Sequence, residues 1–166
     1  MINKIKLSLV LLVIAISQSN ALIEVDITRG NLDPLPIAVS PLSAEKETED
    51  NLSKELKQEN IGQKISEVVE NNLKNSGLFN PLNRDAFVQK PDIAHLKPRF
   101  EDWRLIKAQA LVTGKILIKD DKLKVEFRLW DLTAAKEMLA LSFTTTPANW
   151  RRVAHIISDK VYERLT

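Results

Sequence analysis

The stretch IGQKISEVVENNLKNSGLFNPLNRDAF, residues 61–87, decides the fold, because it reads as a helix, its end and a short extended return. Five apolar residues fall on one side of a 3.6-residue helical repeat, with polar residues outside that arc. They are Ile61, Ile65, Val68, Val69 and Leu73. Gly77 follows where a helix end tolerates positive φ, and Pro81 prevents the helix from resuming. Since the flanking segments read as strands, the helix is expected to lay its apolar face on a sheet.

The rest of the chain predicts one mixed sheet with helices packed on it. Alternation of apolar and polar residues, or a short apolar run, predicts strands at residues 22–28, 37–39, 110–118, 123–131 and 137–146. The last three are joined by short turns and should form an antiparallel meander. Gly114, inside one of them, indicates a bulge or a close neighbour. Apolar periodicity predicts helices at residues 100–106 and 150–166, the second capped by Asn149.

Residues 1–21 read as a signal peptide. Lys4 and Lys6 form a basic start, residues 7–16 are nearly all apolar, and Ser19 and Ala21 are small residues at cleavage-site spacing. The apolar run is about half of the roughly 20 residues that a membrane-spanning helix needs. We therefore expect an exported chain that begins near Leu22 and inserts no part of itself directly into the membrane after cleavage.

Charge and cysteine usage exclude several function classes. Removing residues 1–21 takes two of the 24 basic residues and none of the 22 acidic ones, so the remaining chain is formally neutral. Neutrality argues against a nucleic-acid partner, which is bound through clustered Lys and Arg. The absence of cysteine excludes disulfides and cysteine-ligated metals. About 145 residues suffice for one domain held by its core.

Two segments are expected to lack regular structure. Residues 43–60 carry many charges and only Leu52 and Leu56 as sizeable apolar side chains. This pattern predicts a solvated loop with some helical tendency, or alternatively a docking surface. Residues 88–98 read as a loop between prolines.

No residue pattern predicts catalysis, a cofactor or a metal site. His155, Ser158 and Asp159 contain the residue types of a hydrolase triad, yet residues three and four apart lie side by side on one helix face. A triad needs its base between the nucleophile and the orienting acid, so we interpret the three as a solvated face with a His155–Asp159 pair. His95 has no neighbouring residues at metal-ligand spacing, and the four glycines form no phosphate loop.

The tryptophans leave one alternative open. Trp103, Trp130 and Trp150 most simply belong to the core or its rim. Strand alternation, however, points Trp130 away from the face that carries Phe127, either under a helix or toward a partner. With Trp103 it could line the site of a stand-alone periplasmic module for a lipid, peptidoglycan or a small ligand.

Residues 22–28, LIEVDIT, are the strongest functional feature. A strand at a chain end has few constraints holding it in place. It can pair within its own sheet, or it can add to the sheet edge of another protein. The sequence alone leaves both readings open.

Three stretches together resemble the N-terminal domain of the TolB family, which belongs to the Tol-Pal system of Gram-negative envelopes. They are LKNSGLFNPLNRDAF (73–87), the Trp103 segment that leads to ALVTGKI (110–116), and WRRVAHIISDKVYERLT (150–166). The resemblance implies an α/β domain with a mixed five-stranded sheet sandwiched by helices, similar to the anticodon-binding-domain fold. Residues 22–36 would then be an N-terminal partner-binding segment and residues 37–166 the domain itself.

The resemblance implies a non-enzymatic periplasmic adaptor. In this family a β-propeller follows the domain and holds the outer-membrane lipoprotein Pal, and the assembly serves outer-membrane integrity, cell division and bacteriocin import. Pal is expected as a partner only if a propeller is present, and no propeller repeats lie within residues 22–166, which suggests a fragment or split gene. The other implied partner is the C-terminal domain of TolA. The expected contact residues are Leu22, Ile23, Glu24, Val25, Asp26, Ile27, Thr28 and Arg29.

Overall fold

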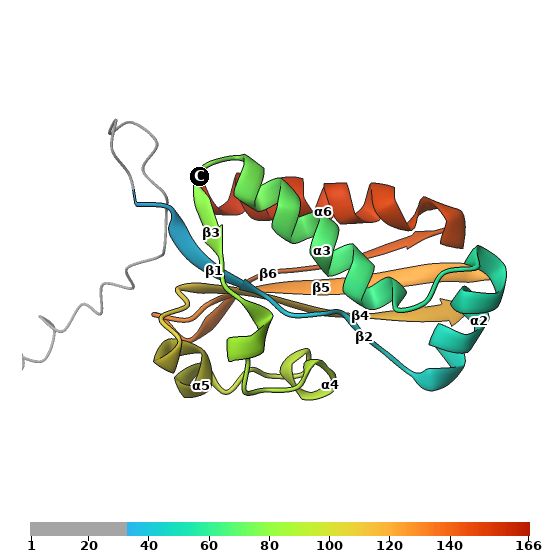
Figure 1. The fold of residues 1–166 in the computed structure, drawn as a ribbon, viewed down its shortest axis with the longest axis horizontal. Helices are drawn as coiled ribbons and strands as arrows, with labels where there is room; N and C mark the ends of the chain where they lie inside the picture. Colours follow the sequence, from blue (N-terminus) through green and yellow to red (C-terminus); the bar gives the residue numbers. More distant parts are fainter. Residues whose placement is uncertain (1–32) are drawn as a thin grey trace, which may run out of the picture.

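The computed structural model describes residues 33–166, which form a mixed sheet with helices on both faces (Figure 1). The strand predicted at residues 22–28 lies outside the described residues, as do the signal peptide and all eight expected contact residues, 22–29. The predicted α/β fold class is confirmed for the described part.

The sheet has six strands that occupy five positions across its width. The strands are β1 (Leu35–Val39), β2 (Ser43–Ala44), β3 (Phe79–Pro81), β4 (Ala110–Lys119), β5 (Lys122–Asp131) and β6 (Lys136–Thr145). Their order is β3-β1-β4-β5-β6, with β1 parallel to both neighbours and β4, β5 and β6 antiparallel. β1 and β2 pair with successive parts of β4, and Pro41 lies between them. β2 therefore occupies the same position across the sheet as β1 and adds no further position.

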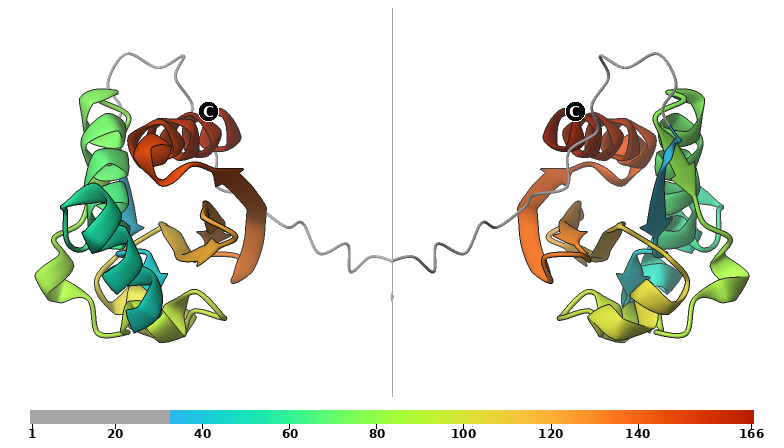
Figure 2. Two further views of the ribbon diagram at one scale, coloured as in Figure 1. Left: turned by 90° about the vertical axis from the view of Figure 1, so that its right-hand side faces the viewer. Right: turned by 90° about the vertical axis from the view of Figure 1, so that its left-hand side faces the viewer.

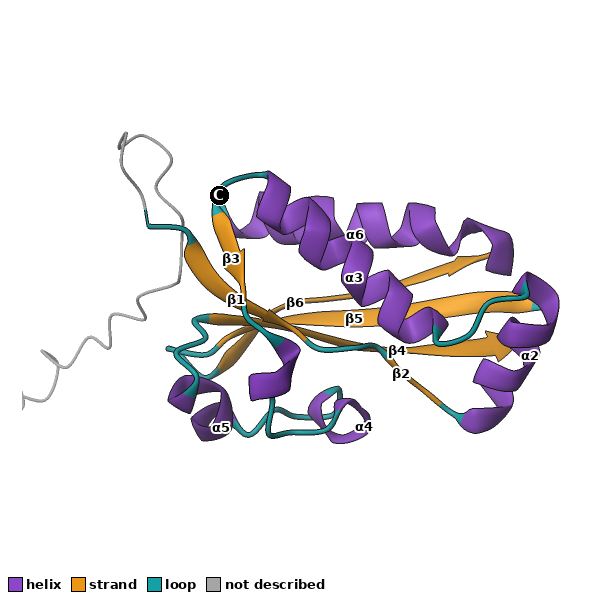
Figure 3. Cartoon of the chain, viewed as in Figure 1, coloured by secondary structure: helices purple, strands orange, loops and turns teal. Residues whose placement is uncertain are grey.

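Within residues 33–166, five α-helices surround this sheet (Figure 3). They are α2 (Lys46–Leu56), α3 (Ile61–Asn75), α4 (Pro91–Ala94), α5 (Phe100–Leu105) and α6 (Trp150–Leu165). α3 and α6 lie side by side over one face, while α4 and α5 lie on the other side of the sheet (Figures 1 and 2). The predicted packing of the organising helix is confirmed, because Ile61, Ile65, Val69 and Leu73 are buried against the sheet; Val68 is half-buried beside them.

Strand alternation in β5 sorts the interior into two layers. Leu123, Val125, Phe127 and Leu129 are at most 1% exposed and lie in the layer under α3 and α6. The opposite layer is smaller and gathers around Trp103 and the residues of α5. Burial at about 25 cal/mol per Å² of apolar surface makes the first layer the main source of stability.

The structure corrects two predictions of irregular segments. Residues 43–60 contain β2 and the helix α2, whose Thr48 and Leu52 are buried, with Leu52 at 0% exposure. Leu56, four residues after Leu52, also packs against the core, and Thr48 Oγ1 accepts the Ile118 N–H at 3.3 Å. The expected loop at 88–98 contains the short helix α4, which begins with Pro91 at a position where proline is favoured.

The prediction that Asn149 caps the last helix through its side chain is wrong. Asn149 precedes α6, but its side chain makes no capping hydrogen bond. Its amide instead donates to the hydroxyls of Thr145 and Thr146, and a 3-10 turn, Pro147–Asn149, leads into the helix. The prediction for Gly114 is confirmed as a close neighbour, since a Cβ there would lie 2.3 Å from the Glu126 oxygen.

Candidate functional site

The described chain begins where the predicted partner-binding segment joins β1, an inner strand next to the edge strand β3. The Leu35 N–H donates to the Leu78 oxygen at 2.9 Å, and Leu35 pairs with Phe79 in the parallel ladder. Residues 35 and 36 of the predicted segment thus belong to β1. The C-terminus lies at the same end of the molecule (Figure 1), where the ring of Tyr162 packs edge-on against Phe79 at 6.1 Å.

The two tryptophans proposed for a ligand site are core residues. Trp103 is 1% exposed and Trp130 is 7% exposed. Trp130 Nε1 donates to Thr113 Oγ1 at 2.9 Å, and its ring packs edge-on against Phe100 of α5. The first sequence alternative, packing under a helix on the far face, is therefore right. A ligand-binding module built on Trp103 and Trp130 loses the two side chains on which it rested.

His155, Ser158 and Asp159 do not form a triad. Ser158 is 4% exposed, and its hydroxyl donates to the Ala154 oxygen at 3.0 Å. Asn72 of α3 reaches across to both side chains: its Nδ2 lies 2.8 Å from His155 Nδ1 and donates to Ser158 Oγ at 3.0 Å. The predicted His155–Asp159 pair is thus replaced by a link from His155 to α3. The cluster joins two helices and holds no activated nucleophile.

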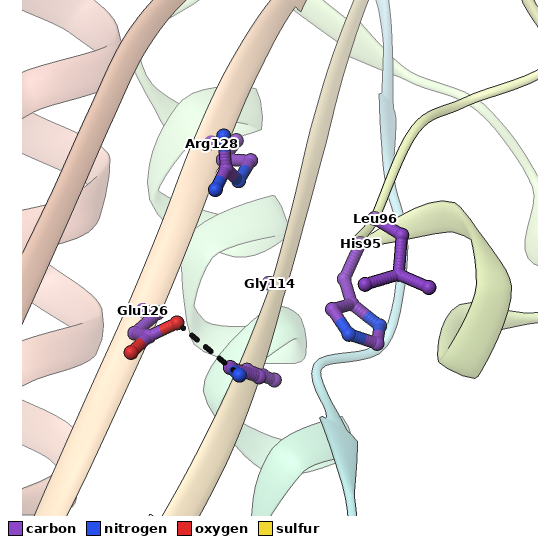
Figure 4. A pocket seen from close by; sticks show the side chains of 6 residues that line it. His95, Leu96, Gly114, Glu126 and Arg128 are labelled. Atoms are coloured by element: carbon purple, nitrogen blue, oxygen red, sulfur yellow. Dashed lines mark ion pairs between the residues drawn. The ribbon is translucent and has the colours of Figure 1, made fainter.

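The other histidine borders a small hollow on the open face of β4 and β5 (Figure 4). The hollow has a volume of about 100 Å³. It is lined by His95, Leu96, Gly114, Lys115, Glu126 and Arg128. His95 Nδ1 lies 3.2 Å from Ser43 Oγ, so this histidine joins the α4 segment to β2. Ligand pockets are typically about 300–1,000 Å³, and the hollow is far smaller.

Charges on this open face are paired along and across the strands. Glu126 contacts Lys124 at 2.6 Å and Lys115 at 3.5 Å. The hydrogen bond from Lys124 is the main cause that lowers the pKa of Glu126 below its ordinary value. Arg128 forms an ion pair with Glu137 of β6. The face carries a solvated network of ion pairs between three basic and two acidic side chains.

A second polar groove runs between α3 and the segment after β3. Arg84 Nε donates to Glu70 at 2.7 Å, and Glu67 lies 3.7 Å from Arg84 Nη1. Burial raises the pKa of Glu70, an effect that the hydrogen bond from Arg84 opposes. The groove is open, with a volume of about 420 Å³. Arg84 is paired with both glutamates of the groove, so it connects α3 to the segment after β3.

Two further findings concern the described residues alone. Within residues 33–166, no group of three or more His, Asp or Glu side chains is arranged to hold a metal ion. In the same part of the chain, no helix combines the length and apolar character needed to cross a bilayer.

Sequence reasoning missed the polar centre of the second layer. Gln89 is 3% exposed, and its Oε1 accepts from the Arg99 N–H at 2.8 Å and from Trp103 Nε1 at 3.0 Å. A glutamine between two prolines looks like an ordinary loop residue. Only the nearby Trp103, whose buried N–H needs an acceptor, could have signalled this role.

The fold and the described surface define a class, a mixed α/β domain with small or open polar hollows. Comparison with known families is more specific. Residues 23–138 match the family model described as the TolB amino-terminal domain, so the chain belongs to that family.

Similar proteins agree with this assignment. The chain is 68% identical, over 157 residues and 95% of its length, to the Tol-Pal system protein TolB of Pelagibacter ubique. It spans about a third of that relative, 35%.

The solved structure of TolB from Acinetobacter baumannii matches with a TM-score of 0.63 at 19% identity, covering 87% of this chain and 31% of that one. Lipoprotein GNA1162 from Neisseria meningitidis matches with a TM-score of 0.50 at 14% identity, covering 80% of this chain and all of that one. Both structural matches concern the fold alone.

Proposed function

We propose that this chain is the N-terminal part of a periplasmic, non-enzymatic adaptor of the Tol-Pal system. Membership of the TolB amino-terminal domain family carries the proposal. The described surface is consistent with it, because its hollows are small or open. Such a surface suits protein contact better than enclosure of a substrate.

Residues 22–29 are proposed to bind the C-terminal domain of TolA by adding a strand to its sheet. The alternating pattern of LIEVDIT supports this mode, since a donated strand needs one apolar and one polar face. The segment would be anchored by β1, which lies between β3 and β4 and is parallel to both. A partner that pulls on residues 22–29 would therefore load a strand paired on both sides and not an edge strand.

Pal is proposed as a second partner only of a longer chain that carries a propeller. The adaptor would then link TolA of the inner membrane to Pal of the outer membrane. The consequences would be outer-membrane integrity, envelope invagination during cell division, and exploitation of the same assembly by bacteriocins.

Calorimetric titration against the TolA C-terminal domain of the same organism tests the TolA contact. Deleting residues 22–32 should abolish binding while the circular dichroism spectrum stays folded, because β1 is retained. A control chain with residues 22–28 scrambled keeps the composition and loses the alternation, so it should bind at least tenfold more weakly. Unchanged affinity of the deletion variant would refute the proposal.

A further inference from the structure

The two edges of the sheet differ sharply in protection. β3 is three residues long, contains Pro81 and lies beside α3. β6 is ten residues long, and residues 138–145, MLALSFTT, contain neither proline nor charge. Natural sheets blunt exposed edges with prolines, charges or short strands, because an open edge pairs readily with another chain. β6 has a β-bulge at Met138, and over residues 139–145 it shows none of these devices.

The apolar side chains of β6 that face the interior are also incompletely covered. Leu139, Leu141 and Phe143 pair with β5 residues that are at most 1% exposed, yet these three are only half-buried. Within the described residues β6 is the last strand on this side, so no strand beyond it completes their packing. Phe143 stacks on Phe127 at 6.1 Å on one side and lacks a neighbouring strand on the other.

The opposite row of β6 is small and exposed. Ala140, Ser142 and Thr144 stand in register with Arg128, Glu126 and Lys124 of β5, respectively. Long side chains on β5 can therefore lean over short ones on β6. A position beyond β6 lies about 9.6 Å from β5, two strand spacings, which Arg or Lys can bridge to a carboxylate.

We propose that β6 accepts a seventh strand from a partner protein whose residues alternate between apolar and mainly acidic side chains. Apolar residues of that strand would cover Leu139, Leu141 and Phe143. Acidic residues would lie opposite Ala140 and Thr144, where they would share Arg128 with Glu137 and Lys124 with Glu126. The residue opposite Ser142 would be uncharged, because Glu126 stands behind it.

One contact sets the length of the pairing. Arg164 Nε donates to the Met138 oxygen at 3.4 Å, so α6 already occupies the edge at that residue. The available ladder therefore runs over residues 139–145. Seven residues at about 3.3 Å each span about 23 Å, the length of an ordinary strand.

A designed peptide tests the proposal on the full chain. The probe is acetylated and amidated Ile-Glu-Val-Thr-Val-Glu-Ile, whose pattern is the same in either direction. Amide exchange and 15N chemical shifts should report new protection of those amides of residues 139–145 that point away from β5. A peptide with lysine in place of both glutamates should bind at least fivefold more weakly, and the difference should shrink at high salt.

Backbone methylation separates strand pairing from loose apolar contact without altering the protein. Methylating the amide nitrogens on one edge of the peptide should weaken binding at least tenfold, because those N–H groups pair with β6. Methylating those on the other edge should leave affinity nearly unchanged. Equal effects of the two peptides, shifts that map elsewhere, or no binding at 1 mM peptide would overturn the proposal.

Two other occupants of the edge give distinct results, and either would overturn the proposal. If residues 139–145 are protected without peptide and become exposed on dilution, the occupant is a second copy of this chain. If deletion of residues 22–32 exposes them, the occupant is the chain's own N-terminal segment. The peptide test does not depend on TolA binding. TolA binding is tested separately, by titrating the deletion variant against the TolA C-terminal domain.

Discussion

The backbone oxygen of Leu42 lies directly against Gly62, so that a Cβ at residue 62 would stand 2.1 Å from it. The same segments exchange hydrogen bonds: the Leu42 N–H donates to the Gly62 oxygen at 3.3 Å and to Ser66 Oγ at 3.1 Å. Ser66 Oγ in turn donates toward the Ser40 and Gly62 oxygens. This contact fixes the first turn of α3 onto the chain between β1 and β2.

Gly62→Ala should therefore destabilise the domain. Alanine favours a helix over glycine by about 1 kcal/mol, but the clash with backbone forces α3 to shift, and overpacking costs about 1–3 kcal/mol. We expect the free energy of unfolding in urea to fall by up to about 2 kcal/mol. Asn71→Ala, on the exposed side of α3, is the matched control and should change it by less than about 0.5 kcal/mol. A stabilised Gly62→Ala chain would contradict the contact.

Gln89→Leu should loosen the second layer. The substitution leaves Trp103 Nε1 and the Arg99 N–H without their acceptor, and each unsatisfied buried donor costs about 1–3 kcal/mol. The Trp103 environment should change, so near-ultraviolet circular dichroism is the direct measurement, with urea unfolding beside it. Gln109→Leu, at an exposed position, should leave both signals close to those of the parent chain. Equal behaviour of the two variants would show that the Gln89 hydrogen bonds contribute little.

Asn72 should couple α3 to α6. Asn72→Ala removes the donor to Ser158 Oγ and the contact with His155, and a net hydrogen bond contributes about 1 kcal/mol. A double-mutant cycle with Ser158→Ala should give a coupling energy of at least about 0.5 kcal/mol. Asn71→Ala with Ser158→Ala is the control cycle and should be additive. Additivity in both cycles would mean that Asn72 and Ser158 do not act together.

The sequence predicted well those elements whose apolar residues follow one period over many residues. α3 and β5 are of this kind, because eight of their inward side chains stand at regular spacing and are fully buried. Prediction failed where few residues decide the structure. Only Thr48, Leu52 and Leu56 dock α2, and Pro41 separates β1 from β2 within one sheet position.

Candidate site residues were harder to predict, because their roles depend on partners far away in the chain. Ser158 and His155 are adjacent on one helix, and the sequence suggested a pair with Asp159. The actual partner, Asn72, is more than 80 residues away and has no pattern that marks it. For β6, the alternation of apolar and polar residues predicted a strand. It could not predict that this strand lies at the edge of the sheet, because strand order does not follow from a local sequence pattern.

Glu126→Gln should lower stability at neutral pH and not at acidic pH. The pKa of Glu126 is lowered in the folded state, first by the hydrogen bond from Lys124, so the native carboxylate holds its charge more strongly than the unfolded one. The resulting stabilisation is present above the ordinary carboxyl value of 4.5 and is lost as the pH falls through the lowered folded pKa. Because the side chain is 31% exposed, the loss at pH 7 should be only about 0.5 kcal/mol.

Unfolding midpoints measured from pH 7 down to pH 3 should converge for the variant and the parent chain. Glu163→Gln removes a more exposed pair within α6 and should show a smaller difference. A gap between parent and Glu126→Gln that widens toward pH 3 would reverse the sign of the linkage and contradict the assigned ion pairs.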